Sequence, residues 1–317
     1  MSRPPSDLGA PQYYSLPPNP AAKLWKSPCR IRYNSANPRM ERLGSYQIEA
    51  EVGRGGMGVV YRAMDPIIQR PVALKVIRLQ DIVDPEERAS HRERLYREAR
   101  SAGMLSHPTI VTVYQVGEEN DIAYIAMEFV NGPTLDHLLT AQPRPKQKHI
   151  FNVLRPVAAG LDYAHSRGVI HRDIKPSNIM VGEGGAVKIT DFGIAKIAAG
   201  AATRTGLRLG TPFYMSPEQV QGKPVDGRTD QYSLAIVAYQ MFVGERPYKA
   251  ETLPTLIYKI LSGQPEVSAT LARNVGEEIG SVLCKALSKD PEARYPTCVE
   301  FMNALERAAI ASLTQRT

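Results

Sequence analysis

Cysteine is scarce in this chain of 317 residues, and the three that occur lie far apart. Cys29, Cys284 and Cys298 are too few and too scattered for a disulfide framework. No group of cysteine and histidine residues has the spacing of a zinc site. We therefore expect ordinary reduced thiols.

Long apolar runs are also missing, although 43% of the residues are apolar, which is ample for a packed core. The most apolar segment, Leu234 to Val243, can form a buried helix but is too short to cross a bilayer. The N-terminus brings Arg3 and then prolines in place of the apolar core of a secretory signal. The sequence thus predicts a cytoplasmic protein with no membrane span.

The folded part also lacks a strongly basic balance. The formal charge is +7, but residues 1–44 hold seven Lys/Arg against two acids, so they carry 7 − 2 = +5 and the remainder only 7 − 5 = +2. Acids are interleaved with bases along the predicted helices, which is typical of a solvated surface. This pattern excludes a track for a nucleic-acid backbone.

Residues 1–44 contain eight of the 25 prolines and show little hydrophobic periodicity. We expect a basic, Pro-rich and disordered extension. It holds the single tryptophan, Trp25, so packing of this segment on the folded body is an alternative. A second hypothesis is that Met40, and not Met1, is the biological start, which the intact mass of natively expressed protein would test.

The pattern changes at Tyr46, where short segments rich in β-branched and aromatic residues begin. One amphipathic helix, Pro85 to Leu105, interrupts them, and after Gly132 the pattern becomes mostly helical. An α+β fold follows, with a sheet-rich lobe over 45–130, a helical lobe over 131–312 and a tail over 313–317. The predicted strands are Tyr46 to Val52, Val59 to Met64, Pro71 to Ile77, Ile110 to Val116 and Ile122 to Phe129; the predicted helices are Leu135 to Leu139, Ile150 to Ser166, Thr229 to Val243, Leu253 to Leu261, Ile279 to Ser288 and Val299 to Ser312.

The most informative stretch runs from His171 to Asn178 and is followed by an Asp-Phe-Gly triplet that begins at Asp191. Transfer of a γ-phosphoryl group needs a base near the acceptor hydroxyl, metal ligands and a cation that offsets negative charge. Asp173 can be the base, Lys175 the cation and Asn178 a neutral metal ligand, with Asp191 as the charged one. A lone Asp-Phe-Gly is usually a turn, so the pairing of the two motifs carries the prediction.

The segment Gly53 to Val60 fits the pattern G-x-G-x-x-G-x-V. That spacing alone also fits a dinucleotide-binding turn or a plain hairpin. A dinucleotide-binding turn leads into a helix, whereas Val59 to Ala63 has the pattern of a strand, so the glycines are expected to cap a hairpin. Without side chains, Gly53, Gly55 and Gly58 let backbone N–H groups approach phosphates closely.

Together these motifs resemble the protein-kinase family over roughly Tyr46 to Ser312, with the catalytic motifs in the family's order. The resemblance implies the bilobal kinase fold, with a five-stranded antiparallel N-lobe that carries one main helix. It also implies ATP as the phosphate donor and Mg²⁺ as the metal, with Mn²⁺ as an alternative.

Further roles follow from the resemblance alone. Lys75, at the end of Val-Ala-Leu-Lys, would hold the α and β phosphates and pair with a glutamate of the following helix. Glu98 flanks the apolar stripe of that helix and is preferred over the other glutamates there. The adenine ring would lie between the apolar side chains of Val52, Val60, Ala73 and Met180; Met127 would guard a back pocket, and Glu128 and Val130 would offer hinge backbone groups.

The segment from Asp191 to Glu218 resembles an activation segment that ends in Ser-Pro-Glu, where the family more often has Ala-Pro-Glu. An arginine before the catalytic aspartate, here Arg172, marks kinases that a phosphate switches on. We therefore expect activating autophosphorylation at Thr203 and Thr205, with Arg172 and Lys196 receiving the phosphate. The family also implies that Thr211 helps to hold Asp173 and Lys175, that Glu218 pairs with Arg294, and that Asp230 anchors the catalytic loop.

Lys-Pro-Ser-Asn at 175–178 and Gly-Thr-Pro at 210–212 resemble serine/threonine kinases, and finer details resemble bacterial kinases related to PASTA-domain receptors. The expected partners are proteins with Ser/Thr acceptors and a transient homodimer that phosphorylates itself in trans. The chain ends soon after its last predicted helix, which argues against a receptor unless it is part of a larger protein. A pseudokinase would lack Lys75, Asp173 or Asp191, and a small-molecule phosphotransferase would lack an ordinary activation segment.

Overall fold

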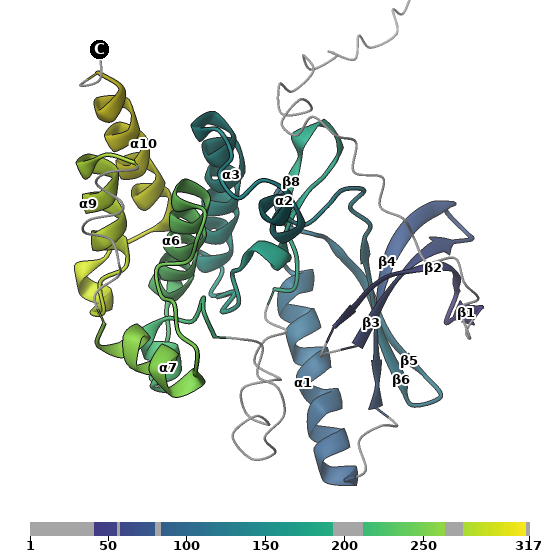
Figure 1. Cartoon of the computed structure of the whole chain (residues 1–317). Helices are drawn as coiled ribbons and strands as arrows, with labels where there is room; N and C mark the ends of the chain where they lie inside the picture. The colour runs from purple at the N-terminus through teal and green to yellow at the C-terminus, as the bar shows by residue number, and fades with distance from the viewer. Residues whose placement is uncertain (1–40, 56–57, 80–83, 193–211, 264–274, 315–317) are drawn as a thin grey trace, which may run out of the picture.

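The computed structural model describes residues 41–55, 58–79, 84–192, 212–263 and 275–314. A sheet with one helix forms the N-terminal lobe and a group of helices forms the C-terminal lobe, so the predicted bilobal α+β fold is confirmed (Figure 1). Most of the predicted extension, with Trp25 and the two candidate start residues, lies outside the described residues.

The sheet of the N-lobe has the order β1-β2-β3-β4-β6-β5, with every neighbouring pair antiparallel. The five predicted strands are present. A sixth, β1, pairs Arg42 and Leu43 with the start of β2, and Leu43 is buried against Tyr46. Residues 41–44 therefore belong to the fold and not to the extension. The strands are β1 (Arg42–Leu43), β2 (Tyr46–Gly55), β3 (Gly58–Asp65), β4 (Arg70–Arg78), β5 (Val113–Glu119) and β6 (Ile122–Glu128).

Strand β5 begins at Val113, three residues later than the sequence pattern predicts. Ile110 instead forms a parallel bridge with Ile189 of the C-lobe, and Val111 N–H donates to Ile189 C=O. The first residues of this apolar run therefore contact the C-lobe, and the rest form a strand of the N-lobe. Hydrophobicity alone does not reveal this division, because both parts are apolar.

The glycine-rich segment closes a hairpin, as predicted, since β2 and β3 pair with Gly55 opposite Gly58. Gly58 has a φ of +135°, and a Cβ there would lie 2.0 Å from the Val76 carbonyl oxygen. No other residue fits at this position, so the close packing of β3 on β4 depends on this glycine.

Helix α1 (Pro85–Gly103) covers the sheet, as Figure 1 shows. Asp84 caps it by accepting hydrogen bonds from the Glu86 and Glu87 amides, and Pro85 occupies its first turn. Its buried Leu95 and Ala99 pack with Ala123 and Ile125 of β6. The predicted helix is therefore confirmed, and its apolar stripe places it against the strands that lead to the hinge.

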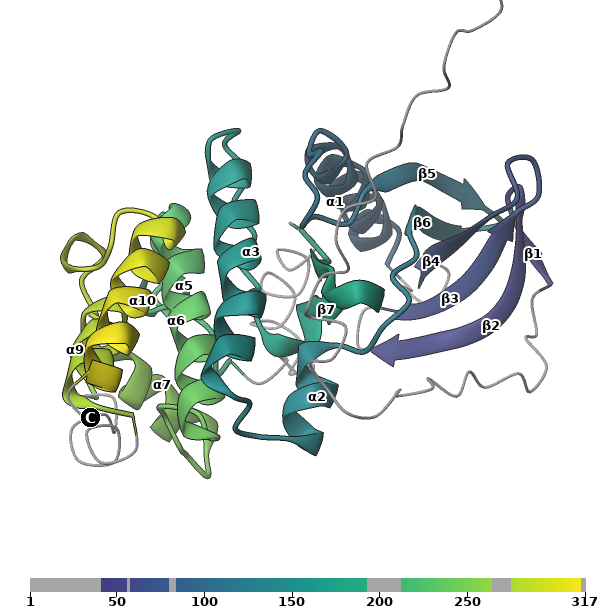
Figure 2. The same cartoon turned by 90° about the horizontal axis from the view of Figure 1, so that it is seen from above.

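The C-lobe packs around α6, whose side chains are buried on nearly every face. Asp226 caps this helix and Gly244 ends it in the left-handed conformation, with a φ of +88°. Figure 2 shows α3 beside α6, with α9 and α10 on the outer side. The helices are α2 (Leu135–Ala141), α3 (Gln147–His165), α5 (Pro217–Val220), α6 (Gly227–Val243), α7 (Leu253–Leu261), α9 (Glu277–Ala286) and α10 (Cys298–Thr314).

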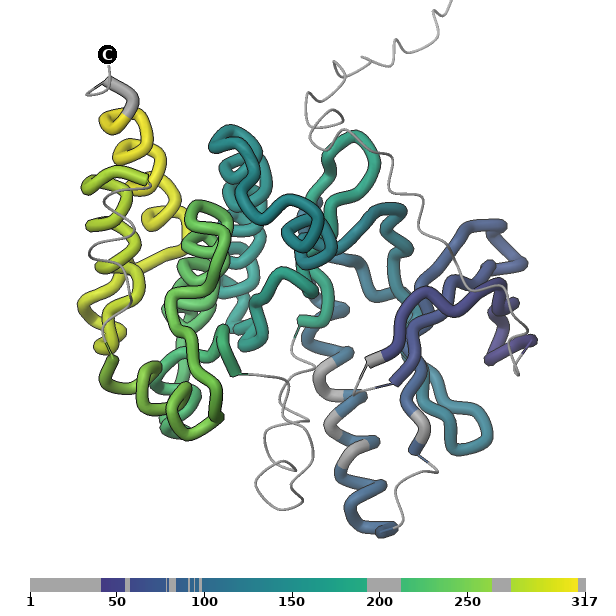
Figure 3. Tube along the Cα trace, in the orientation of Figure 1, coloured from purple at the N-terminus to yellow at the C-terminus, as the bar shows by residue number. Residues whose placement is uncertain are grey.

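The predicted helices of the C-lobe are all present, with ends that differ by a few residues. A small hairpin of β7 (Ile179–Val181) and β8 (Val187–Ile189), between α3 and α5, was not predicted. The chain passes from the sheet through the hinge to α10, which lies far from the sheet in Figure 3. In the parts of the chain that are described, no helix has the length and apolar character needed to cross a bilayer.

Candidate active site

Asp173 lies in the loop between α3 and β7 and is held by two neighbours in that loop. Lys175 Nζ donates to its Oδ2 at 2.7 Å, and Asn178 Nδ2 donates to the same oxygen at 3.0 Å and to the Asp173 carbonyl at 2.8 Å. The Asn178 amide nitrogen is therefore used within the loop, which leaves its carbonyl oxygen for a metal. The three predicted residues form one cluster.

The backbone of this loop is anchored on α6. The buried Asp230 accepts from the amides of His171 and Arg172 through its two carboxylate oxygens, at 2.8 and 2.7 Å. Arg172 has a φ of +69°, a left-handed conformation that is costly for a residue with a side chain. The predicted anchor is therefore in place, and it holds backbone strain next to Asp173.

Asp191 approaches the site from the end of β8 and pairs with Lys75. Lys75 Nζ lies 2.7 Å from Asp191 Oδ1, and Lys75 is only 6% exposed. His171 bridges the two loops: its Nε2 lies 2.8 Å from the Thr190 carbonyl, and its ring packs against Phe192. One histidine thus connects the loop that carries Asp173 to the segment that carries Asp191.

Glu98 lies on α1, but its side chain is outside the described residues, so the predicted pair with Lys75 stays a prediction. Lys196, Thr203, Thr205 and Thr211 also lie outside the described residues.

The residues predicted to contact adenine, together with Met127, lie on strands of both lobes. Ala73 of β4 pairs in register with Met127 of β6, while Val52 and Val60 lie on the β2–β3 hairpin and Met180 on β7. Their contact with adenine stays a prediction.

The hinge after β6 offers backbone groups. The Glu128 carboxylate forms an ion pair with Lys188 at 2.7 Å and accepts a hydrogen bond from the Thr112 amide. These contacts hold the side chain in place, so only the backbone of Glu128 is offered at the hinge. The Val130 amide makes no backbone hydrogen bond within the described part of the chain. The contact of this amide with adenine stays a prediction.

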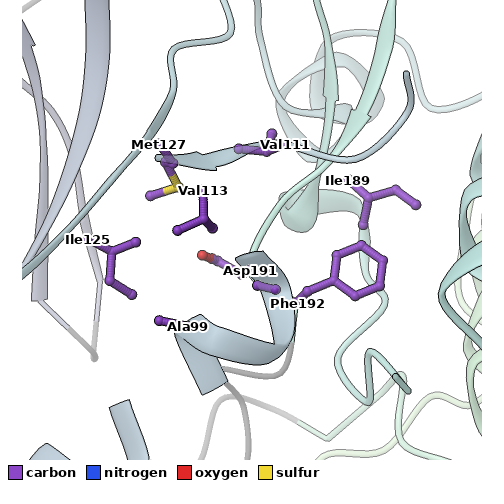
Figure 4. A pocket seen from close by; sticks show the side chains of 9 residues that line it. Ala99, Val111, Val113, Ile125, Met127, Ile189, Asp191 and Phe192 are labelled. Atoms are coloured by element: carbon purple, nitrogen blue, oxygen red, sulfur yellow. The ribbon is translucent and has the colours of Figure 1, made fainter. Parts of the chain in front are cut away.

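Met127 lines a pocket together with residues of both lobes (Figure 4). Asp191 is the one charged residue in its lining, so the carboxylate that pairs with Lys75 borders an apolar space. The lining residues are Ala99, Ala102, Val111, Val113, Ile125, Met127, Ile189, Asp191 and Phe192.

Glu218, at the start of α5, forms a buried ion pair with Arg294. Two hydrogen bonds of 2.8 Å join the guanidinium and the carboxylate, and Thr229 Oγ1 donates to Glu218 Oε1 at 2.7 Å. Burial opposes ionisation, but the bonds from Arg294 and Thr229 keep the pKa of Glu218 below its usual value. This pair fixes the end of the predicted activation segment to the C-lobe.

His165 connects the anchor Asp230 to α10, which sequence reasoning did not anticipate. Its Nε2 lies 2.8 Å from Asp230 Oδ2, and its Nδ1 lies 3.7 Å from Asp162, which accepts from the Cys298 and Val299 amides. Burial lowers the pKa of His165, but the hydrogen bonds and charges of the two aspartates outweigh it and raise the pKa to about 9. Burial also raises the pKa of the Cys298 thiol. These contacts join Asp230, the end of α3 and the start of α10 in one hydrogen-bonded network.

This network predicts a pH dependence of stability. Because the pKa of folded His165 is about 9, against 6.5 for the free side chain, its contribution is complete below pH 6.5 and is lost as the pH rises through 9. The thermal midpoint should therefore fall between pH 6.5 and 8, and His165→Gln should show a flatter profile. Burial lowers the pKa of Lys289 to about 8, so the contribution of Lys289 to stability increases with pH above 8. The interval from pH 6.5 to 8 therefore reports mainly on His165. Equal slopes in both proteins would contradict the assignment.

A family model described as "Protein kinase domain" matches residues 46–305, and the chain therefore belongs to the protein kinase domain family. It is 38% identical over 259 residues to the serine/threonine-protein kinase PrkC of Bacillus subtilis, a match that covers 81% of this chain and 39% of that protein. It is 37% identical over 269 residues to the serine/threonine-protein kinase PknB of Mycobacterium tuberculosis, covering 83% and 42%.

The crystal structure of the PknI kinase domain of Mycobacterium tuberculosis is similar, with a TM-score of 0.64 and 30% identity over 84% of this chain and 97% of that one. The chain spans about two fifths of the length of PrkC and PknB. These relatives agree with the resemblance to bacterial serine/threonine kinases that the motifs indicate.

Proposed function

We propose that this chain is an ATP-dependent serine/threonine protein kinase. The observation that carries the proposal is that two clusters of the predicted residues lie on adjoining segments. Asp173, Lys175 and Asn178 contact one another, Lys75 of the N-lobe pairs with Asp191, and the Thr190 amide beside Asp191 donates to the Asn178 carbonyl at 2.9 Å. A pseudokinase is not favoured, because the lysine and both aspartates are present and lie in contact with partners that suit catalysis.

In this proposal Asp173 accepts the proton of the acceptor hydroxyl and Lys175 offsets charge on the moving phosphoryl group. Lys75 binds the α and β phosphates, with Glu98 as its partner. The donor set of Asp191 and Asn178, a carboxylate and an amide carbonyl, suits Mg²⁺ or Mn²⁺, which would neutralise the triphosphate. Gly53, Gly55 and Gly58 contribute backbone N–H groups to the phosphates. A cytoplasmic location is part of the proposal, since the reaction draws on ATP.

Incubation with γ-labelled ATP, Mg²⁺ and an unstructured protein acceptor tests this function. We expect label on serine or threonine of the acceptor and of the chain itself, and none in a Lys75→Met variant, which loses the phosphate contact but keeps a long buried side chain. In a parallel reaction with small-molecule acceptors, transfer to these and none to protein would favour the small-molecule phosphotransferase.

We also propose that phosphorylation of the activation segment switches the kinase on. Arg172 is partly buried beside Asp173, and in the described structure its guanidinium has no ion-pair partner, so it is available to a phosphate. We expect phosphate on Thr203 and Thr205 after ATP incubation and lower activity in the Thr203→Ala/Thr205→Ala variant, because phosphate would order the segment against Arg172 and Lys196. Phosphosite mapping with mass spectrometry checks this, and active protein with neither threonine modified contradicts it.

A transient homodimer would carry out this autophosphorylation in trans. Initial rates should then rise faster than linearly with enzyme concentration, whereas a strictly linear dependence would indicate reaction in cis.

A further inference from the structure

Gln219 connects two parts of the C-lobe that are 47 residues apart in the chain. It is the third residue of α5, and its side-chain Oε1 accepts from the Ser216 amide at 3.0 Å. Its Nε2 donates to the Arg172 carbonyl at 2.8 Å. Because one partner is a backbone donor and the other a backbone acceptor, only this orientation of the amide satisfies both.

The Arg172 carbonyl belongs to the peptide unit that immediately precedes the base Asp173. The other polar group of that unit, the Asp173 N–H, donates to His171 Nδ1 at 3.2 Å. Both ends of the peptide are therefore held by side chains, one from the loop itself and one from α5. No helix or strand hydrogen bonds stabilise this unit, because the loop lies between α3 and β7.

This peptide needs such support, because Arg172 has a left-handed φ of +69°. Strained backbone of this kind persists only where surrounding contacts fix it. Asp230 holds the Arg172 amide from one side, and Gln219 holds the Arg172 carbonyl from the other. The rotation of the Arg172–Asp173 peptide, and with it the direction of the Asp173 side chain, depends on both contacts.

We propose that Gln219 is a positioning residue for the base: its amide donor at the Arg172 carbonyl sets the orientation of the peptide that carries Asp173. The inference rests on the proposed kinase function and assigns Gln219 a role beyond the cap of α5. The cap itself uses the Oε1 side of the amide, and the positioning contact uses the Nε2 side, so the two roles are separable.

Gln219→Glu separates them. A glutamate keeps the acceptor for the Ser216 amide and remains a good capping-box residue, but it presents an oxygen to the Arg172 carbonyl in place of a donor. We expect kcat to fall by about 10²-fold, as for a misplacement of about 1 Å, with KM for ATP unchanged, because the adenine cleft is built from other elements. The thermal midpoint should stay close to that of the wild type.

Ser216→Ala is the matched control, because it removes the hydroxyl that accepts from the Gln219 backbone N–H and leaves the Gln219 side chain intact. It should keep wild-type kcat. Gln219→Met loses both polar contacts and should match Gln219→Glu in kcat while also losing stability. An unchanged kcat in Gln219→Glu, or an equal loss in Ser216→Ala, would overturn the inference.

Hydrogen exchange of the His171–Asp173 amides tests the positioning role of Gln219 independently of activity. Exchange should accelerate in Gln219→Glu and stay at the wild-type rate in Ser216→Ala; equal protection in the two variants refutes the positioning role. Wild-type protein that is folded but transfers no phosphate would refute the proposed function alone, since the exchange result still tests Gln219.

Discussion

Replacing Asp173 by asparagine is expected to lower phosphoryl transfer by about 10²- to 10⁴-fold, the range for loss of a general base. The asparagine side chain has the same size and still accepts the hydrogen bond from Lys175, so the loop should keep its shape, but it no longer takes the proton of the acceptor hydroxyl. The measurement is initial rate of label transfer from ATP, with binding of ATP followed in parallel. Binding should be nearly unchanged.

Asp136→Asn is the matched control for this experiment. Asp136 is an exposed carboxylate on α2 in the same lobe, and its replacement removes the same charge without touching the loop. Wild-type rates are expected. If Asp173→Asn retained full activity, Asp173 would not be the base, and the assignment of the catalytic loop would be wrong even though the fold is that of a kinase domain.

Replacing Arg294 by methionine is expected to destabilise the chain by about 3–5 kcal/mol, because it leaves Glu218 buried without its cation. For a domain of this size that corresponds to a fall in thermal midpoint of roughly 6–20 °C. The loss should be largest at neutral pH. In the variant, burial without Arg294 raises the pKa of folded Glu218, so the stability of the variant declines as the pH rises above the pKa of an unfolded glutamate.

Two comparisons make this test specific. Arg155→Ala removes a partner from the ion pair of Arg155 with Glu306, in which the arginine is 67% exposed, and should cost no more than about 1 kcal/mol. The double variant Arg294→Met/Glu218→Leu removes both charges and should recover much of the stability. A single Arg294 variant as stable as Arg155→Ala would show that the pair contributes little.

The local elements could be predicted because each has a local cause. The apolar stripe of α1 and the unbroken apolar character of α6 predict these two helices, and the strand after Gly58 distinguishes a hairpin from a dinucleotide-binding turn. The errors arise where a residue serves a distant partner: Ile110 bridges Ile189, and Leu43 is buried on the sheet although it follows a Pro-rich segment.

The residues of the candidate site likewise fall into those that the sequence predicts and those that only the structure reveals. The motifs name Lys75, Asp173, Asn178 and Asp191 because phosphoryl transfer needs those chemical groups at those spacings. The motifs do not predict roles for His165 or Gln219, because neither residue belongs to a catalytic motif and the role of each depends on its neighbours in the fold. Ser216 and Gln219 form a capping box in the structure, a contact that by itself marks only the start of a short helix.

The sequence by itself determined the kinase fold, the order of its two lobes and the residues that can perform the chemistry, since these depend on local patterns of side chains. Only the tertiary structure decided which groups meet: Lys75 with Asp191 across 116 positions, Gln219 with Arg172, and His165 between Asp162 and Asp230. The physical reason is that such hydrogen bonds and ion pairs depend on distances of about 3 Å, which the packing of the elements sets and the spacing along the chain does not.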